Sequence, residues 1–293
     1  VPTKSLAPRP ATACGASCLP WAEQLVRRMH SMQPGAATLL GVLLGFIFPA
    51  MVASSCRLPV EFPNSVGPSG ATIGPRGELV VVSDGGTVLF VDLEDFTVRE
   101  DTALNDKYID SYGWFDLEGV TMTAPESSKF LYIGMENHAA VLEYEWQHSH
   151  EIFRRFDLPG LGQDGVQSMA WVPADSSSHM GYLYVGSGEG GTVLIYELPV
   201  LESVGVEARA VLRHSWSPLQ GDSRKIAGLA YSAGYVFVSY NEGTSSHVLI
   251  FRVLANGMCG DEVAEQYQVD VSDAQGMAVR QRSDGTWEVF FCS

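Results

Sequence analysis

The stretch "YLYVGSGEGGTVLIYEL", residues 182–198, joins two apolar runs through an acidic, glycine-rich turn. The same order recurs at three other places in the chain. These are "LVVVSDGGTVLFVDL" at 79–93, "LYIGMENHAAVLEY" at 131–144 and "YVFVSYNEGTSSHVLIFRV" at 235–253. Runs of β-branched and aromatic residues around such turns are typical of β-hairpins. The chain is therefore predicted to consist of repeated hairpins.

A short apolar segment with one small residue marks each unit of this repeat. The small residues, spaced by 49, 49, 60 and 48 positions, are Gly70, Gly119, Ser168, Gly228 and Gly276. Periods of this size are typical of propeller blades. Innermost strands crowd around a central channel, which explains the small side chains. The sequence therefore predicts an all-β fold, a five-bladed β-propeller.

A fourth, alternating strand is expected in four of the five units, where polar and apolar residues suit a half-exposed outer strand. These strands begin near Thr97, Glu151, Ala208 and Glu265. The fifth unit ends at "TWEVFFCS" after its second strand. We expect the segment "CRLPVEF", residues 56–62, to complete that blade. A disulfide from Cys292 to Cys56 or to Cys259 is possible, and the sequence does not decide between them.

Residues 1–55 are predicted to be a targeting leader with one hydrophobic helix, followed by a propeller domain at 56–293. Arg27 and Arg28 precede an apolar run at 36–53, and small residues close it. This order is that of a secretory-type signal. The run is also close to the minimum length of a membrane-spanning helix. Removal of the leader and its retention as an anchor are both open.

The piece upstream of these arginines is basic and nearly free of acidic residues, as in transit peptides. A transit-like piece before a second signal resembles the bipartite leaders of thylakoid-lumen proteins, and the twin arginine resembles a Tat signal. We therefore expect a non-cytosolic location. The thylakoid lumen of a plastid is favoured, with plain secretion as the alternative.

The charge of the chain argues against a nucleic-acid partner. The first 55 residues hold four basic residues and one acidic residue, which leaves 14 basic and 33 acidic residues in the body. The body's net charge of −19 repels phosphate backbones. "GLGQDG" at 160–165 matches a dinucleotide-binding pattern, but it precedes a predicted strand where that site needs a helix.

The segment "FDLEGVTM" resembles the inner strand of the SdiA-regulated family of five-bladed propellers, related to esterase-like and lactonase-like propellers. Asp116, Glu118, Gly119 and then Glu136 match its motif. The resemblance covers about residues 60–293. At other positions the chain departs from the family, which prefers acidic residues where this chain has Gln167, Lys225 and Gln275.

The resemblance implies a divalent cation near the channel, calcium being the expected ion. Carboxylate and amide oxygens are suitable calcium ligands. Acidic turns after the second strands form a further candidate ring, although an Asp-Gly turn is also a plain hairpin signal. The candidate metal ligands are therefore Glu118, Glu136, Asp84, Glu189 and Glu242.

Fold alone does not fix function. The sequence shows no catalytic motif, so we expect a non-enzymatic binding or assembly module. An accessory subunit with a protein partner, in a membrane complex, fits the predicted targeting. The alternative is a divalent-metal-dependent hydrolase of the lactonase or phosphoesterase type. That alternative needs three or four converging ligands, and the glutamines at 167 and 275 argue against it.

Overall fold

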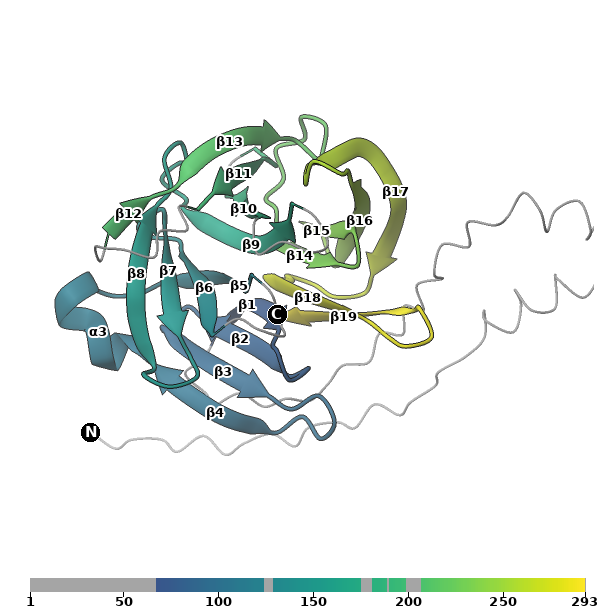
Figure 1. Ribbon diagram of the computed structural model, residues 1–293. Coiled ribbons are helices and arrows are strands. Elements are labelled where there is room, and N and C mark those ends of the chain that lie inside the picture. Colours follow the sequence, from purple (N-terminus) through teal and green to yellow (C-terminus); the bar gives the residue numbers. More distant parts are fainter. Residues whose placement is uncertain (1–66, 124–128, 175–180, 189, 199–206, 293) are drawn as a thin grey trace, which may run out of the picture. The chain divides into compact units, whose positions relative to one another are not determined.

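The protein is described here as a computed structural model (Figure 1). The structure describes residues 67–123, 129–174, 181–188, 190–198 and 207–292. The predicted leader and the expected strand at 56–62 lie outside these residues. No helix of the described part is long and apolar enough to span a membrane.

The first two sheets are antiparallel and follow the chain order outward from an inner strand. The first holds β1 (Pro68–Ile73), β2 (Leu79–Ser83), β3 (Thr87–Val91) and β4 (Val98–Ala103). The second holds β5 (Leu117–Thr121), β6 (Phe130–Met135), β7 (Ala140–Glu145) and β8 (Glu151–Asp157), with β12 (Glu207–Arg209) at its outer edge. Because β12 pairs in parallel with β8, the second sheet has a fifth strand.

The next two sheets repeat this plan. The third holds β9 (Val166–Pro173), β10 (Gly181–Ser187), β11 (Val193–Glu197) and β13 (Val211–Trp216). The fourth holds β14 (Gly228–Ser232), β15 (Tyr235–Glu242), β16 (Ser245–Val253) and β17 (Cys259–Val269). A two-stranded sheet of β18 (Gly276–Gln281) and β19 (Trp287–Cys292) follows.

The inner strands form a closed ring, which makes the described fold a β-propeller. Along the ring, β1 lies beside β5, β5 beside β9, β9 beside β14, β14 beside β18, and β18 beside β1. Figure 1 shows the blades radiating from these strands. Four blades are complete, and the described part of the sheet between the fourth and the first has two strands.

The small residues of the inner strands are required by close approach, as the sequence predicted. A Cβ on Gly70 would lie 2.6 Å from the carbonyl oxygen of Glu118 in the next blade. A Cβ on Gly276 would lie 2.5 Å from the carbonyl oxygen of Ser69. Real Cβ atoms essentially never come this close, so larger residues would push neighbouring blades apart.

The hydrophobic core is divided among the junctions between neighbouring sheets. The first three junctions bury 16, 13 and 13 apolar residues. The two junctions made by the β18–β19 sheet bury seven each. Because no blade covers both of its own faces, burial between neighbours holds the ring together.

The structure adds one element that the sequence did not predict and divides another. A helix, α3 (Leu104–Tyr112), follows β4. The stretch from Ala208 is not one outer strand: β12 joins the second sheet and β13 the third. Tertiary pairing decides this division, because alternation alone does not say which sheet an outer strand joins.

A Cys259–Cys292 disulfide is also excluded. Both thiols are free. Cys259 packs at the junction of the third and fourth sheets, whereas Cys292 is buried between β18–β19 and the first sheet. Cys56 lies outside the described residues.

Candidate metal centre

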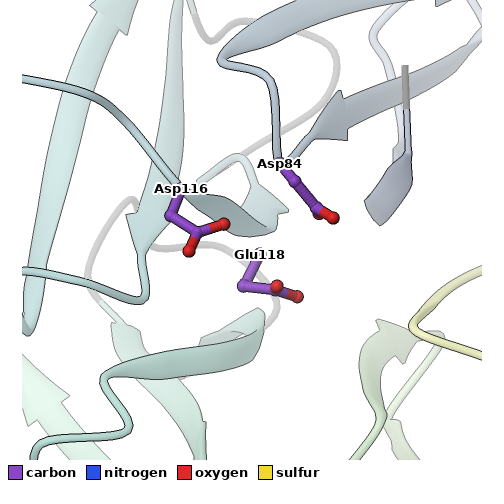
Figure 2. Close-up of side chains that lie close together, drawn as sticks. All are labelled: Asp84, Asp116 and Glu118. Carbon is purple, nitrogen blue, oxygen red and sulfur yellow. The ribbon is translucent and has the colours of Figure 1, made fainter. Parts of the chain in front are cut away.

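Three carboxyl groups converge where the first and second blades meet at the start of their inner strands. One ligand oxygen from each of Asp84, Asp116 and Glu118 lies within 4.8 Å of the others. Figure 2 shows Asp116 and Glu118 reaching into the same space as Asp84. Oxygens bound to one Ca²⁺ at 2.3–2.6 Å lie at most about 5.2 Å apart. The spacing therefore suits a shared hard cation.

Backbone hydrogen bonds at the strand ends place these residues. The amide of Asp84 donates to the carbonyl oxygen of Gly67 at 3.1 Å, which extends the β1–β2 pair by one step. In the next blade the amide of Glu136 donates to the carbonyl oxygen of Asp116 at 2.9 Å. The two blades thus present acidic residues at the same level of the ring.

The buried side chain of Asn105, in α3, joins the two acidic segments. Its Nδ2 donates to the carbonyl oxygen of Gly85 at 2.8 Å, and its Oδ1 accepts from the amide of Phe115 at 2.6 Å. Gly85 follows Asp84 and Phe115 precedes Asp116 in the chain. Asn105 is therefore a positioning residue. The sequence did not predict this role, because Asn105 is not part of any recognisable motif.

Glu136 is the fourth acidic residue of the site. Its Oε1 accepts from Nε2 of Gln167 at 2.5 Å, and its carboxyl group is also hydrogen-bonded to that of Asp116. Gly165 allows the backbone before β9 to lie this close to Glu136. It has φ +53°, and a Cβ there would lie 1.7 Å from the carbonyl oxygen of Glu136. The last glycine of "GLGQDG" therefore serves close packing of the third blade against the site.

Burial and mutual repulsion make these groups hard to ionise together. The pKa of Glu118 is raised to about 8, first by burial and then by the charges of Asp84, Glu136 and Asp116, while Lys225 acts in the opposite direction. Burial also raises the pKa of Asp116, with Glu136 and Asp84 adding to the rise. Like charges and desolvation both disfavour the ionised form. A bound cation would relieve this repulsion.

The channel beside Glu118 is nearly closed. A cavity of about 10 Å³ is lined by residues of all five inner strands, including Gly70, Glu118, Ser168, Leu229 and Gly276. That is about the room for one water molecule. Ser168, the hydroxyl residue in this lining, donates from Oγ to the carbonyl oxygen of Ile226 at 3.4 Å.

The structure brings together only some of the predicted ligands. Asp84 and Glu118 meet, and Glu136 contacts the same cluster through Asp116, which joins the channel position to the turn positions that the sequence treated separately. Asp116 belongs with them, and the Asp-x-Glu motif was the signal for it. Glu189 lies outside the described residues. Gln275 is held by its backbone amide, which donates to the carbonyl oxygen of Cys292 at 2.9 Å.

The surroundings of Glu242 differ from those of Asp84 and Glu136. Its Oε2 lies 2.8 Å from Nη1 of Arg224 and 3.2 Å from Nε2 of His247. Arg224 also pairs with Asp222 through Nη2 at 2.6 Å and lies over the ring of Tyr240 at 4.2 Å. Among the described residues, Glu242 is not part of the cluster of Asp84, Asp116 and Glu118, and it lies beside a basic side chain.

The comparisons with known proteins support the fold. No protein-family model matches the chain, and no curated protein sequence matches it. Among solved structures, a glutaminyl cyclase from Myxococcus xanthus is similar, with a TM-score of 0.51 and 12% identity over 78% of this chain and 86% of that one. The Cps50 (Swd1) β-propeller domain of Myceliophteria thermophila gives a TM-score of 0.44 at 12% identity, covering 72% of this chain and 76% of that one. At such identities the likeness concerns the propeller fold alone.

Proposed function

We propose that the protein is a non-enzymatic binding module, an accessory or assembly subunit, whose ring binds a divalent cation. Ca²⁺ is the proposed ion, held by Asp84, Asp116 and Glu118 with Glu136 beside them. The observation that carries the proposal is the convergence of three ligand oxygens within 4.8 Å. An all-oxygen ligand set suits Ca²⁺ or Mg²⁺ rather than softer metals. The cation would fix the acidic ends of two blades in one arrangement.

We favour a binding role over catalysis because the cavity beside Glu118 is small. The cavity beside Glu118 admits about one water molecule. A partner would therefore contact the rim of the ring and its loops, where propellers present rigid surfaces. We propose a protein partner, in a membrane complex, and no nucleic acid, because the body carries a net charge of −19.

The proposal also covers the number of blades, the family and the location of the protein. We propose that the β18–β19 sheet is the fifth blade of a five-bladed ring and that the chain is related to the SdiA-regulated family through Asp116, Glu118 and Gly119. On the basis of the predicted leader, we propose a non-cytosolic location, the thylakoid lumen or the secretory route. Ca²⁺ sites of modest affinity are typical of such compartments, where the ion is abundant.

Calorimetric titration of the metal-free protein with Ca²⁺ and Mg²⁺ tests the cation site. Wild type is expected to bind one Ca²⁺ with a dissociation constant of about 10⁻⁵–10⁻³ M, the range of sensor and extracellular sites. Glu118→Gln should weaken binding at least about tenfold. Glu242→Gln is the matched control, because the same change is made at a carboxylate already paired with Arg224.

Two results would contradict the cation site. One is no heat of binding at Ca²⁺ concentrations well above 10⁻³ M. The other is equal weakening by Glu118→Gln and Glu242→Gln, which would place the effect outside the cluster. Copurification with a stoichiometric protein partner tests the binding role separately.

The second candidate function is a metal-dependent hydrolase, favoured by the convergence of ligand oxygens from Asp84, Asp116 and Glu118. A divalent cation held by these residues would polarise a carbonyl or phosphoryl oxygen of a substrate. Lactone and phosphoester substrates, and a glutaminyl substrate suggested by the name of the similar structure, would be assayed with Ca²⁺, Mg²⁺ and Mn²⁺. Turnover that Glu118→Gln abolishes and Glu242→Gln leaves unchanged would establish catalysis and overturn the non-enzymatic role.

A further inference from the structure

Trp114 is the most exposed large apolar side chain in the part of the chain that the structure describes. Its exposed fraction is 68%, whereas the other tryptophans of that part are only 3–6% exposed. These are Trp146, Trp171, Trp216 and Trp287. Burial of an aromatic ring removes about 150–250 Å² from water, and tryptophan is enriched among the anchors of protein interfaces. The exposed ring therefore indicates a contact with another molecule.

Hydrogen bonds on consecutive residues fix the backbone around this ring. The carbonyl oxygen of Trp114 accepts from Nδ2 of Asn137 at 2.7 Å. The amide of Phe115 donates to Oδ1 of Asn105 at 2.6 Å. Gly113 has φ 76° and ψ −166°, a conformation essentially restricted to glycine. The ring is thus presented on a fixed backbone, which lowers the entropy that binding of a partner would cost.

Trp114 lies on the same side of its segment as two carboxylates of the cluster. Along "WFDLE", residues 114–118, Phe115 and Leu117 are buried in the core of the first junction. The residues between and beside them, Trp114, Asp116 and Glu118, are exposed or partly exposed. Such alternation is that of an extended segment with one buried side, in which alternate residues lie about 6.6 Å apart. One long basic side chain therefore reaches both the ring and the carboxyl group of Asp116.

Other aromatic rings near the surface already carry a basic side chain of the same chain. The guanidinium carbon of Arg154 lies 5.5 Å from the centroid of the Phe153 ring, and that of Arg224 lies 4.2 Å from the centroid of Tyr240. Within the described ranges, no basic side chain lies over the ring of Trp114. Tryptophan is the best acceptor for such a contact. Trp114 can therefore accept a basic group from another molecule.

The charge around this ring favours a basic partner. The body carries a net charge of −19, and Asp84, Asp116 and Glu118 share one space. Lys107, the basic residue of α3, donates from Nζ to the carbonyl oxygen of His150 at 2.6 Å. Complementary charge speeds the encounter of two partners and fixes their register. Free organic cations are bound by cages of several aromatic rings, so a single ring suits a basic side chain that the partner's own surface holds in place.

We propose that Trp114 anchors the protein partner of this propeller by accepting a lysine or arginine side chain, whose charged group also contacts Asp116. This inference deepens the proposed binding role and rests on it. The partner presents a basic segment to the rim of the second blade. Because a cation in the carboxylate cluster would neutralise part of the same charge, Ca²⁺ and the basic segment compete through Asp116.

Fluorescence anisotropy with the full chain in EDTA tests the contact. The probes are two fluorescein-labelled peptides, one of alternating Gly and Arg and one of alternating Gly and Glu. The basic peptide is expected to bind to the wild type and the acidic peptide is not. Trp114→Ala should weaken binding by about 3- to 30-fold, the range of a cation–π contact. Phe153→Ala is the matched control, because it removes another exposed aromatic ring that Arg154 already covers, and should leave the affinity unchanged.

Further variants separate the parts of the contact. Trp114→Leu keeps an apolar side chain without a π system and should weaken binding as Trp114→Ala does, whereas Trp114→Tyr should retain most of the affinity. Asp116→Asn should weaken binding and reduce its dependence on salt. Thermal unfolding should show the Trp114 variants within about 2 °C of the wild type, since the side chain is exposed.

Four results would overturn this contact. They are wild-type affinity in Trp114→Ala, wild-type affinity in Trp114→Leu, equal binding of the acidic and the basic peptide, and a change in Phe153→Ala as large as that in Trp114→Ala. Cosedimentation with phosphatidylcholine vesicles that Trp114→Ala abolishes would instead assign the ring to a lipid surface.

The same variant separates this inference from the proposed function. The peptide measurement is made in EDTA, so it does not depend on whether the cluster binds Ca²⁺. Loss of a copurifying protein partner in Trp114→Ala, but not in Phe153→Ala, would support the contact. Retention of that partner in Trp114→Ala would overturn the contact and leave the binding role in place.

Discussion

Asp84 and Glu242 both lie near the end of the second strand of a blade, Glu242 one position further along in register, yet their surroundings differ. Asp84 lies beside Asp116 and Glu118, so its blade junction collects negative charge. Glu242 lies beside Arg224 and His247. Asp116 leads into β5, the inner strand of the next blade, whereas Arg224 leads into β14, the inner strand of Glu242's own blade. The charge of the residues before these inner strands therefore decides whether a carboxylate at the end of a second strand is neutralised or lies beside further negative charge.

The largest expected effect is on the pH dependence of stability. The folded pKa of Glu118, about 8, lies above its usual value of 4.5. Its contribution to stability is therefore fully present below pH 4.5 and is lost as the pH rises through 8. The free energy of unfolding of the metal-free protein should fall across this window, by at most about 1.4 kcal/mol per pH unit before solvent screening reduces it.

Denaturant unfolding between pH 5 and pH 9 measures this fall. Glu118→Gln should flatten the profile, whereas Glu242→Gln should leave it unchanged. Ca²⁺ added at pH 8 should restore stability in wild type, because the cation replaces the proton. A profile that rises from pH 5 to pH 8, or one that Glu118→Gln does not flatten, would show that the junction is not electrostatically strained.

Asn105→Ala should separate the two acidic segments. It leaves the amide of Phe115 and the carbonyl oxygen of Gly85 without their partner, at a cost of about 1–3 kcal/mol in the free energy of unfolding. Ca²⁺ binding should weaken as well. Urea unfolding and calorimetry measure the two effects. Asn137→Ala is the control, since that exposed side chain donates to the carbonyl oxygen of Trp114 and should change stability by less than about 0.5 kcal/mol.

Gln167→Arg should make the acidic junction resemble the Glu242 junction. A guanidinium group beside Glu136 would neutralise part of the cluster, lower the pKa of Glu118 and compete with the cation. Ca²⁺ affinity should fall about 10- to 100-fold, as measured by calorimetry. Gln167→Met removes the amide without adding charge and should have a smaller effect. If both variants weaken binding equally, the Gln167 amide rather than charge matters at this position.

Arg224→Met makes the converse change and should have the smallest effect. Arg224 is partly exposed, and exposed ion pairs contribute little to stability. Its position over the ring of Tyr240 adds a modest cation–π contribution. Thermal unfolding should show Tm lower by at most about 3 °C, and the variant should gain no Ca²⁺ site near Glu242. A new Ca²⁺ site there would mean that a single unpaired carboxylate is sufficient to bind the ion.

Much of the fold could be predicted because the ring repeats a local pattern. The hairpins around Asp84 and Glu242, and the small residues at positions such as Gly70 and Gly276, follow from short-range patterning and crowding. The helix α3 and the division of the stretch from Ala208 could not be predicted. Both depend on which distant surfaces are free, and local propensity does not report that.

The candidate site was predictable only in part for the same reason. Glu118 and Glu136 stand out in the sequence, and Asp84 does so as a turn residue. Nothing in the chain order indicates that Asp84 and Glu118, 34 positions apart, share one space. Asn105 carries no signal, since its importance lies in two hydrogen bonds across the fold.

By itself the sequence determined the period of the repeat, the crowded inner strands and the acidic balance of the body, because each is a property of neighbouring residues or of composition. Only the tertiary structure decided which acidic residues meet and which are neutralised. The energy of a carboxylate depends on burial and on charges within a few ångströms of it. Those distances are set by the packing of blades against one another.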